Sequence, residues 1–250
     1  MTENTVSTPE LTGKMFLYGQ PELLSLEAHG DLGLVRLDKP FEFASKIKAV
    51  PIVSTEFSSI QKHYPIAFTG VDNPTPVAVV GLADEVNVFV KDGFWDESCY
   101  IPSYLRRHPF ALATTGEDQA ALVVDVASER VGKNPDFPFF KDGEVTQETR
   151  SMLDFCGQFT QEVNRTVNLC NLLKELDLLV SQTATRTNAK GEEEHVANFV
   201  SIDGQKVAAL PGAKLEELMQ NGALAAIFSQ AFSMENWNRL FERRDRHPGA

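Results

Sequence analysis

A change in the spacing of apolar residues near residue 146 constrains the fold of this chain more than any other feature. Beyond that point apolar side chains recur at intervals of three and four, as they do on one face of an α-helix. The stripe consists of Met152, Phe155, Cys156, Phe159, Val163, Val167, Cys170 and Leu173. This spacing predicts one long helix over about residues 146–177.

Before about residue 130 the apolar residues come in short runs separated by turn signals, which is typical of β-strands. The predicted strands are 33–37, 50–57, 65–70, 77–82, 87–95, 110–115 and 120–126, with a short helix at 58–64. The links at 71–76, 91–93 and 115–119 are short, and strands joined by short links pair antiparallel. The N-terminal half is therefore predicted to be dominated by an antiparallel sheet.

The remaining segments predict a mixed C-terminal half. Residues 129–147 contain two prolines and two glycines without a clean period, which predicts an ordered loop joining the halves. A hairpin is expected over 183–203, with Glu192, Glu193 and Glu194 as its solvated tip. Helices are expected at 213–222, 223–232 and 233–241, with Gly222 as a C-terminal stop and Ser233 as an N-cap.

Together these elements predict an α+β fold, in which a sheet-rich antiparallel N-terminal half packs with a long helix and a C-terminal helical region. Residues 1–14 are expected to form a flexible tail. Residues 15–250 are expected to form a single domain, sheet-rich over 15–130 and helical with a hairpin over 146–242.

Composition narrows the partners of the chain. With 35 acidic and 23 basic residues the formal net charge is −12, which disfavours nucleic acid and anionic membrane surfaces. The first fifteen residues lack a basic start followed by an apolar run, and no stretch approaches the ~20 apolar residues of a spanning helix. We therefore expect a cytoplasmic protein without membrane insertion, in an oligomeric state that the sequence does not give.

The three cysteines suit a reducing compartment. Cys156 and Cys170 lie on the helical stripe and are predicted to fill the core. Cys99 follows acidic residues, which would raise its pKa and make it a poor nucleophile.

The segment YLRRHPF, residues 104–110, places two arginines and a histidine together in an acidic chain. Pro102 can open one helical turn there, which would put the bases at a helix C-terminus. The interpretation that we favour is that Arg106 and Arg107 pair with folded acids such as Asp125 or Asp136. The alternative is a binding site for a protein or a small anionic ligand, formed by Tyr104, Arg106, Arg107 and His108.

One metal hypothesis stands beside this site. His29 and Asp31 have the spacing of two ligands in a two-histidine, one-carboxylate iron site, with His63, His108 or His195 as the third ligand. Gly30 followed by Asp31 also reads as a simple turn before a strand. No cofactor is therefore expected, and iron is the alternative.

Several segments together resemble the SapC family of bacterial proteins. They are LYG (17–19), HGDL (29–32), VPIVSTEF (50–57), YPIAF (64–68), VVGL (79–82), NVFV (87–90), YIPSYLRRHPF (100–110), DFCGQF (154–159), LKELDLL (173–179) and LPGAKLEELMQNGALAAIFSQAFSMENWNRL (210–240). As a set they are specific to the family. His108 stands where the family usually has an aromatic residue.

The resemblance implies an accessory or binding protein linked to surface layers or to outer-membrane uptake systems, without an established catalytic residue set. It also implies genomic settings that include flavin-dependent halogenase-like and iron-dependent oxygenase-like proteins. The alternative function is therefore an iron-dependent oxygenase that acts on a peptide or small molecule, and whether the chain is an enzyme stays open.

Overall fold

The computed structural model describes residues 14–82, 86–114, 120–187 and 193–247, and the chain forms two compact units. Unit 1 comprises residues 1–40 and 107–160, and unit 2 comprises residues 41–106 and 161–250. Each unit is built from segments that are far apart in the sequence. The single domain expected over residues 15–250 stays a prediction.

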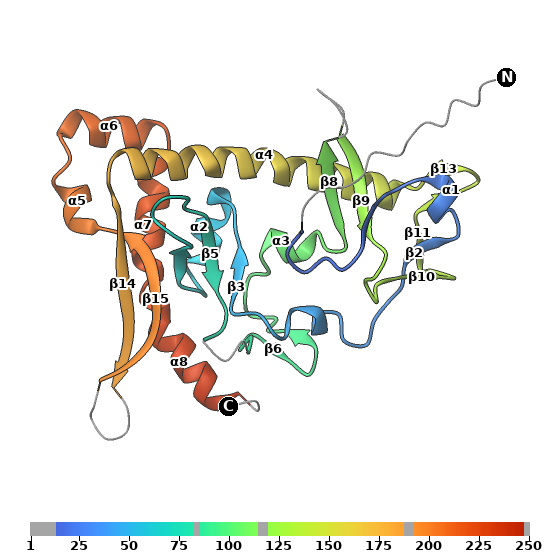
Figure 1. Cartoon of the computed structure of the whole chain (residues 1–250), viewed down its shortest axis with the longest axis horizontal. Helices are drawn as coiled ribbons and strands as arrows, with labels where there is room; N and C mark the ends of the chain where they lie inside the picture. Colours follow the sequence, from blue (N-terminus) through green and yellow to red (C-terminus); the bar gives the residue numbers. More distant parts are fainter. Residues whose placement is uncertain (1–13, 83–85, 115–119, 188–192, 248–250) are drawn as a thin grey trace. The chain divides into compact units, whose positions relative to one another are not determined.

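Unit 1 contains two three-stranded antiparallel sheets and a hairpin (Figure 1). The first sheet has the order β1-β9-β8, formed by Pro21–Leu23, Ala120–Asp125 and Phe110–Thr114. After the short helix α1 (Leu26–His29), the second sheet has the order β10-β2-β11, formed by Val131–Lys133, Leu32–Leu34 and Phe137–Pro138. Strands β12 (Phe140–Lys141) and β13 (Glu144–Val145) form the hairpin. The core consists of Phe110, Leu122, Val124, Phe139 and Cys156.

The prediction of a loop over 129–147 was wrong, because this segment forms the four short strands β10 to β13. The whole segment lies within unit 1, where its turn residues change the direction of the chain. Asn134 and Asp142 adopt positive φ values of 55° and 52°, and Gly143 follows at 81°. Asp142 and Gly143 form the tight reversal between β12 and β13, whereas Asn134 lies in the crossover from β10 to β11, two strands that both run antiparallel to β2 on its two sides.

Unit 2 is built on a five-stranded antiparallel sheet with the order β14-β15-β4-β5-β3. Its strands are Leu179–Thr187, Glu193–Ile202, Ile66–Phe68, Pro76–Val79 and Ala49–Pro51. The β6–β7 hairpin (Val90–Lys91, Phe94–Trp95) turns at Asp92 and Gly93, as predicted. The short helices are η1 (Glu42–Ala44), η2 (Ser54–Glu56), α2 (Phe57–Ile60), α3 (Ser103–Arg106) and α5 (Gly204–Ala208). The longer helices are α6 (Gly212–Gln220), α7 (Ala223–Ser233) and α8 (Asn236–Arg246).

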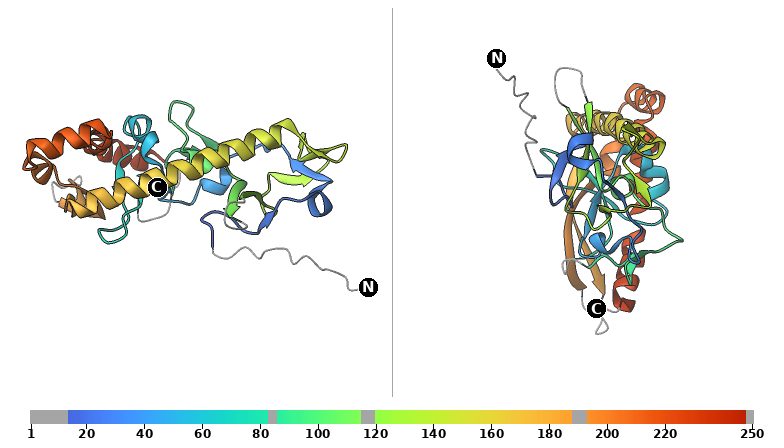
Figure 2. Two further views of the ribbon diagram at one scale, coloured as in Figure 1. Left: turned by 90° about the horizontal axis from the view of Figure 1, so that it is seen from above. Right: turned by 90° about the vertical axis from the view of Figure 1, so that its right-hand side faces the viewer.

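The long helix is confirmed as α4 (Gln147–Glu175), which runs without a break and contributes residues to both units (Figure 2). Its apolar stripe is only partly buried. Cys156, Cys170 and Leu173 are buried, but the side chains of Val163 and Val167 are 37% and 50% exposed. Thr166 occupies the buried face instead, because its hydroxyl donates to the backbone oxygen of Glu162 and so loses no hydrogen bond on burial.

Other helix and strand boundaries differ from the predicted ones where the hydrogen bonds of a side chain end or begin an element. The second half of the strand expected at 50–57 is helical, because the Glu56 carboxylate accepts from the backbone N–H of Val53 and closes a turn. Ser233 ends α7 rather than capping α8, and its buried hydroxyl accepts from the backbone N–H of Ile66. Gly222 does stop α6, at a φ of 80°.

The hairpin is confirmed as β14 and β15, and it begins four residues earlier than expected. Of its predicted acidic tip, Glu193 and Glu194 belong to β15, and Glu192 lies outside the described residues. The α+β class with antiparallel sheets is confirmed. Among the described residues, none of the helices combines the length and the apolar character that crossing a bilayer requires.

Candidate functional site

Arg106 ends the one-turn helix α3, as predicted, and is held by its own neighbours in unit 2. Its Nε donates to the backbone oxygen of Ile101 at 3.0 Å, and its Nη2 donates to the hydroxyls of Tyr100 and Ser103 at 2.9 and 2.7 Å. The same Tyr100 hydroxyl donates to the buried carboxylate of Glu56 at 2.9 Å, which also accepts from the backbone N–H of Ser103 at 2.7 Å. Arg106 therefore belongs to a network that ties α3 to η2.

Arg107 and His108 belong to unit 1 and are buried, at 9% and 4% exposure. The Arg107 guanidinium lies over the ring of Phe159 at 4.5 Å and over that of Tyr18 at 5.8 Å, which are cation–π distances. Burial holds the pKa of His108 at about 4, against a weaker opposing influence of Asp125. The imidazole is therefore neutral at physiological pH.

The two acids expected to pair with the arginines have other described partners. Asp125 is 2% exposed and accepts from the backbone N–H groups of Gly19 and Gln20 at 3.0 and 2.7 Å. Its Oδ2 lies 3.7 Å from Nε2 of His108. Asp136 accepts from the backbone N–H of Arg36 at 2.9 Å. Tyr104 is also buried, at 7% exposure, so Arg106 is the most exposed member of the predicted ligand-binding set.

The predicted iron ligands also have other partners in the structure. Nε2 of His29 lies 3.2 Å from the Glu22 carboxylate, and the exposed Asp31 pairs with Lys133 at 2.9 Å. The pKa of His63 is lowered, chiefly by burial. Among the residues that the structure describes, no group of three or more His, Cys, Asp or Glu side chains could hold a metal ion. The described geometry therefore adds no support to the iron hypothesis.

The three cysteines are buried thiols. Burial raises the pKa of Cys156 and of Cys170 to about 11, and it is also the main cause of the raised pKa of Cys99. All three are therefore protonated at neutral pH, and the prediction that Cys156 and Cys170 fill the core is confirmed.

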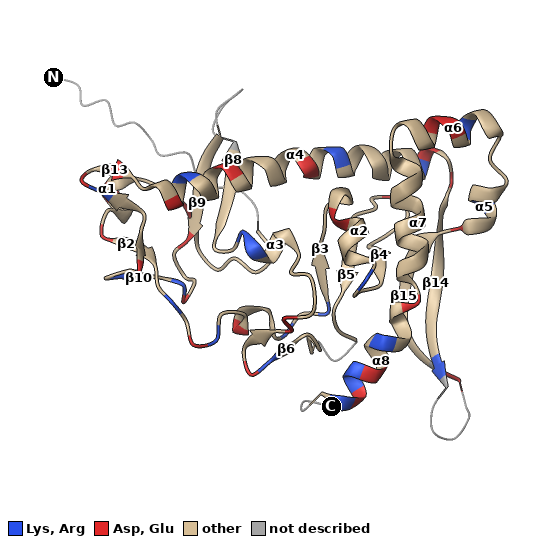
Figure 3. Cartoon of the chain, turned by 180° about the vertical axis from the view of Figure 1, so that it is seen from behind, with Lys and Arg blue, Asp and Glu red and all other residues tan. Residues whose placement is uncertain are grey.

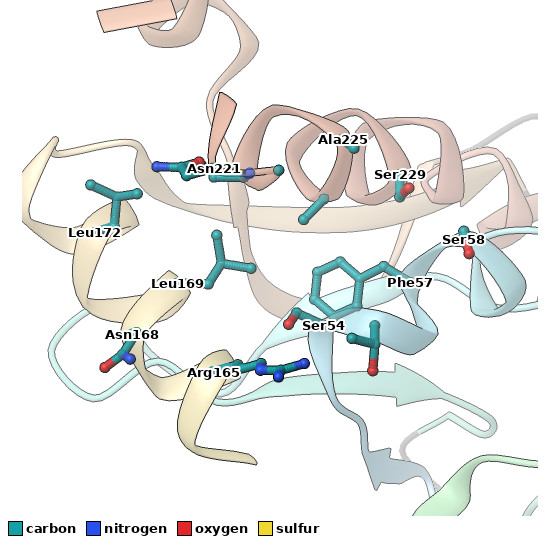
Figure 4. A pocket seen from close by; sticks show the side chains of 14 residues that line it. Ser54, Phe57, Ser58, Arg165, Asn168, Leu169, Leu172, Asn221, Ala225 and Ser229 are labelled. Atoms are coloured by element: carbon teal, nitrogen blue, oxygen red, sulfur yellow. Dashed lines mark hydrogen bonds between the residues drawn. The ribbon is translucent and has the colours of Figure 1, made fainter. Parts of the chain in front are cut away.

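The structure adds a groove of about 560 Å³ in unit 2 that the sequence did not indicate (Figure 4). We name it the α4–α7 groove. It is lined by Ser54, Thr55, Phe57 and Ser58 of η2 and α2, by Arg165, Asn168, Leu169 and Leu172 of α4, and by Asn221, Gly222, Ala223, Ala225, Ala226 and Ser229 at and within α7. Figure 4 shows Leu169 and Phe57 projecting toward each other across it, with Arg165 extending toward Ser54. The walls are thus apolar at the centre and polar around it.

Helix α7 contributes a second apolar surface beside this groove. Its sequence ALAAIFSQAFS is apolar on most sides, which is typical of a helix covered all round. Ile227 packs in the core of unit 2, but Phe228 and Phe232 are 48% and 65% exposed, and their rings stack with centroids 6.1 Å apart. Spacings of three and four place these rings on the same face as Ala225, which lines the groove.

Sequence patterns could have indicated part of this surface. The apolar residues of α7 are too numerous for a helix with one buried face, and this excess is visible in the sequence. The groove itself depends on Ser54 and Phe57 approaching residues of α4 and α7 that lie more than a hundred positions away. Only the tertiary structure brings these residues together.

The model of the family described as SapC matches residues 24–240 of the chain. Comparison with curated proteins and with solved structures gave no match.

Proposed function

Because this chain belongs to the SapC family, whose model covers most of its length, we propose that it is a non-catalytic accessory protein that binds an apolar, helical segment of a partner protein in the α4–α7 groove. The partner is expected to belong to a surface-layer or outer-membrane uptake system, as the family resemblance implies. The observation that carries the proposal is the groove, which lies between two helices and continues into the exposed apolar face of α7.

The walls favour a helix as the occupant. A third helix can place its ridge of side chains between two existing helices at ordinary packing distances. The α7 wall presents Ala225, Ala226 and Ser229, and such small side chains allow the backbone of a partner helix to approach closely. The partly buried Leu169 and Leu172 supply an apolar surface for its leucine-sized anchors, and the buried Phe57 also lies in the wall of the groove.

Charge favours an acidic flank on the same partner helix. Arg165 on the α4 wall has a side chain that is 68% exposed, and its bond to Glu162 at 2.7 Å is an i,i+3 contact of a kind that is weak in water. Its guanidinium can therefore pair with a partner carboxylate at the edge of the groove. Asn168 and Asn221 add neutral hydrogen-bonding groups around it.

The test uses a labelled model peptide of about 14 residues, roughly four helical turns, with leucines spaced three and four apart and glutamates on the flank. We expect saturable binding by fluorescence anisotropy. Ala225→Arg fills the groove and should weaken binding at least about tenfold, which corresponds to ~1.4 kcal/mol. Val167→Ser is the matched control, because Val167 is an exposed apolar residue of α4 that does not line the groove.

A charge swap tests the orientation. Arg165→Glu should weaken the glutamate-flanked peptide and improve binding of a lysine-flanked one. An affinity for the peptide that is unchanged by Ala225→Arg would overturn the proposal, as would the absence of saturable binding. Light scattering that shows a dimer disrupted by Ala225→Arg would assign the groove to a second copy of the chain instead.

A further inference from the structure

A second groove in unit 2, of about 860 Å³, lies between the β6–β7 hairpin and α8. We name it the hairpin–α8 groove. Residues 88–96 supply one wall, and residues 239–247 supply the other. It shares no lining residue with the α4–α7 groove, and its volume falls in the ~300–1,000 Å³ range of small-molecule sites.

The lining carries a small excess of positive charge in a chain that is strongly acidic, with the four cations Lys91, Arg239, Arg243 and Arg246 against the three carboxylates Asp92, Asp96 and Glu242. Figure 3 shows basic positions recurring along α8 with acidic ones between them. Two of the cations are paired, Arg243 with Asp96 at 2.7 Å and Arg246 with Glu242 at 3.2 Å. Two others, Lys91 on the hairpin and Arg239 on α8, form no ion pair among the described residues. Arg239 instead donates through Nη1 to two neutral oxygens, at 3.3 Å each.

The pKa of a nearby histidine is consistent with this positive excess. The pKa of His63 is lowered first by burial and then by the charges of Lys62, Arg243 and Arg239. At His63 the charges of Arg243 and Arg239 therefore outweigh the opposing influence of Asp96.

The hairpin also presents an aromatic side chain to solvent. Phe94 is 55% exposed, while the neighbouring lining residues Phe89 and Trp95 are buried and stacked, with ring centroids 6.3 Å apart. Arg243 lies over the Phe89 ring at 4.5 Å, which fixes its guanidinium against the aromatic wall. The groove thus combines an exposed ring with two cations that lack carboxylate partners within the described structure.

We propose that the hairpin–α8 groove binds a small aromatic anion, with its carboxylate or phosphate held by Lys91 and Arg239 and its ring packed on Phe94. The net charge of −12 repels polyanions, so a ligand with one or two negative charges fits better than an acidic polymer. The site is independent of the partner helix proposed above.

The probes are benzoate and phenyl phosphate, which distinguish the two anion types, with benzyl alcohol as the neutral ring and inorganic phosphate as the anion without a ring. Trp95 lines the groove, so a Trp237→Phe background, in which Trp95 is the remaining tryptophan, reports binding by fluorescence. Isothermal titration calorimetry on the unmodified chain gives the same constants if that background fails to fold.

We expect at least one aromatic anion to bind at least about tenfold tighter than both benzyl alcohol and inorganic phosphate. Arg239→Gln and Phe94→Ser should each weaken it at least about fivefold. Lys206→Gln, which removes a surface lysine paired with Asp177, should leave it unchanged. Equal binding of charged and neutral rings, or binding that survives both groove variants, would overturn the proposal.

Discussion

The buried imidazole of His108 gives the chain a defined pH dependence of stability. Its pKa is about 4 in the folded chain because burial disfavours the charged form, and about 6.5 when unfolded. Between these values the unfolded chain binds the proton more readily. The stability present above pH ~6.5 is therefore lost as the pH falls toward 4.

Burial is the largest cause of this lowered pKa, and the charged groups around the ring adjust it. Asp125 faces Nε2 at 3.7 Å and favours the proton, while the charges of Arg130 and Arg107 oppose it. The Tyr18 ring lies edge-on at 5.1 Å. Each pKa unit corresponds to ~1.4 kcal/mol, so the pKa difference of His108 changes the free energy of unfolding by about 3 kcal/mol over the full pH range. Roughly 2 kcal/mol of this is lost between pH 7 and pH 5.

The assay is urea unfolding at pH 7 and pH 5 for the unmodified chain and for His108→Gln. The variant is expected to lose about 2 kcal/mol less over this interval, whatever its stability at pH 7. His195→Gln is the control, because His195 is an exposed strand residue, and it should keep the full loss. If His108→Gln is too unstable, an NMR titration of the His108 ring in the unmodified chain replaces it. Equal losses in both variants, or a folded-state His108 pKa near 6.5, would refute the reasoning.

Two further predictions concern stability. Glu56→Gln replaces a carboxylate oxygen, which accepts hydrogen bonds, with an NH2 group that faces only other donors. We expect the free energy of unfolding in urea to fall by about 1–3 kcal/mol. An unchanged unfolding midpoint would show that the network between α3 and η2 is not stabilising. The methyl group added by Gly222→Ala would meet no atom within 4 Å, but the alanine would have to adopt a φ near 80°. We expect the free energy of unfolding, measured by thermal unfolding, to fall by about 1 kcal/mol. A gain in stability would contradict the left-handed stop of α6.

Sequence periodicity predicted the elements whose pattern is local and strong. The helix α4, the hairpin of β14 and β15, and the stop at Gly222 follow from spacing and from glycine chemistry. Ser233 shows where such reasoning fails. A serine before a helical run resembles an N-cap, yet the Ser233 hydroxyl accepts a hydrogen bond from the backbone N–H of Ile66, a residue far away in the sequence.

The candidate site was harder to predict, for the same physical reason. The sequence correctly placed Arg106 at the end of one helical turn, but it did not indicate the hydroxyls of Tyr100 and Ser103 that hold the guanidinium. Glu56, which anchors the Arg106 network through Tyr100, lies 44 residues before that tyrosine. Long-range contacts of this kind leave no periodic signal.

Helix binding in the α4–α7 groove is tested most directly by methyl NMR of the alanine-labelled chain with the glutamate-flanked peptide. The methyl groups of Ala225 and Ala226 line the groove, whereas that of Ala111 is fully buried in unit 1. We predict progressive, saturable shifts of Ala225 and Ala226 with Ala111 unmoved. Unchanged Ala225 and Ala226 signals at saturating peptide, or shifts of equal size at all three, would contradict the assignment of this groove as the binding site.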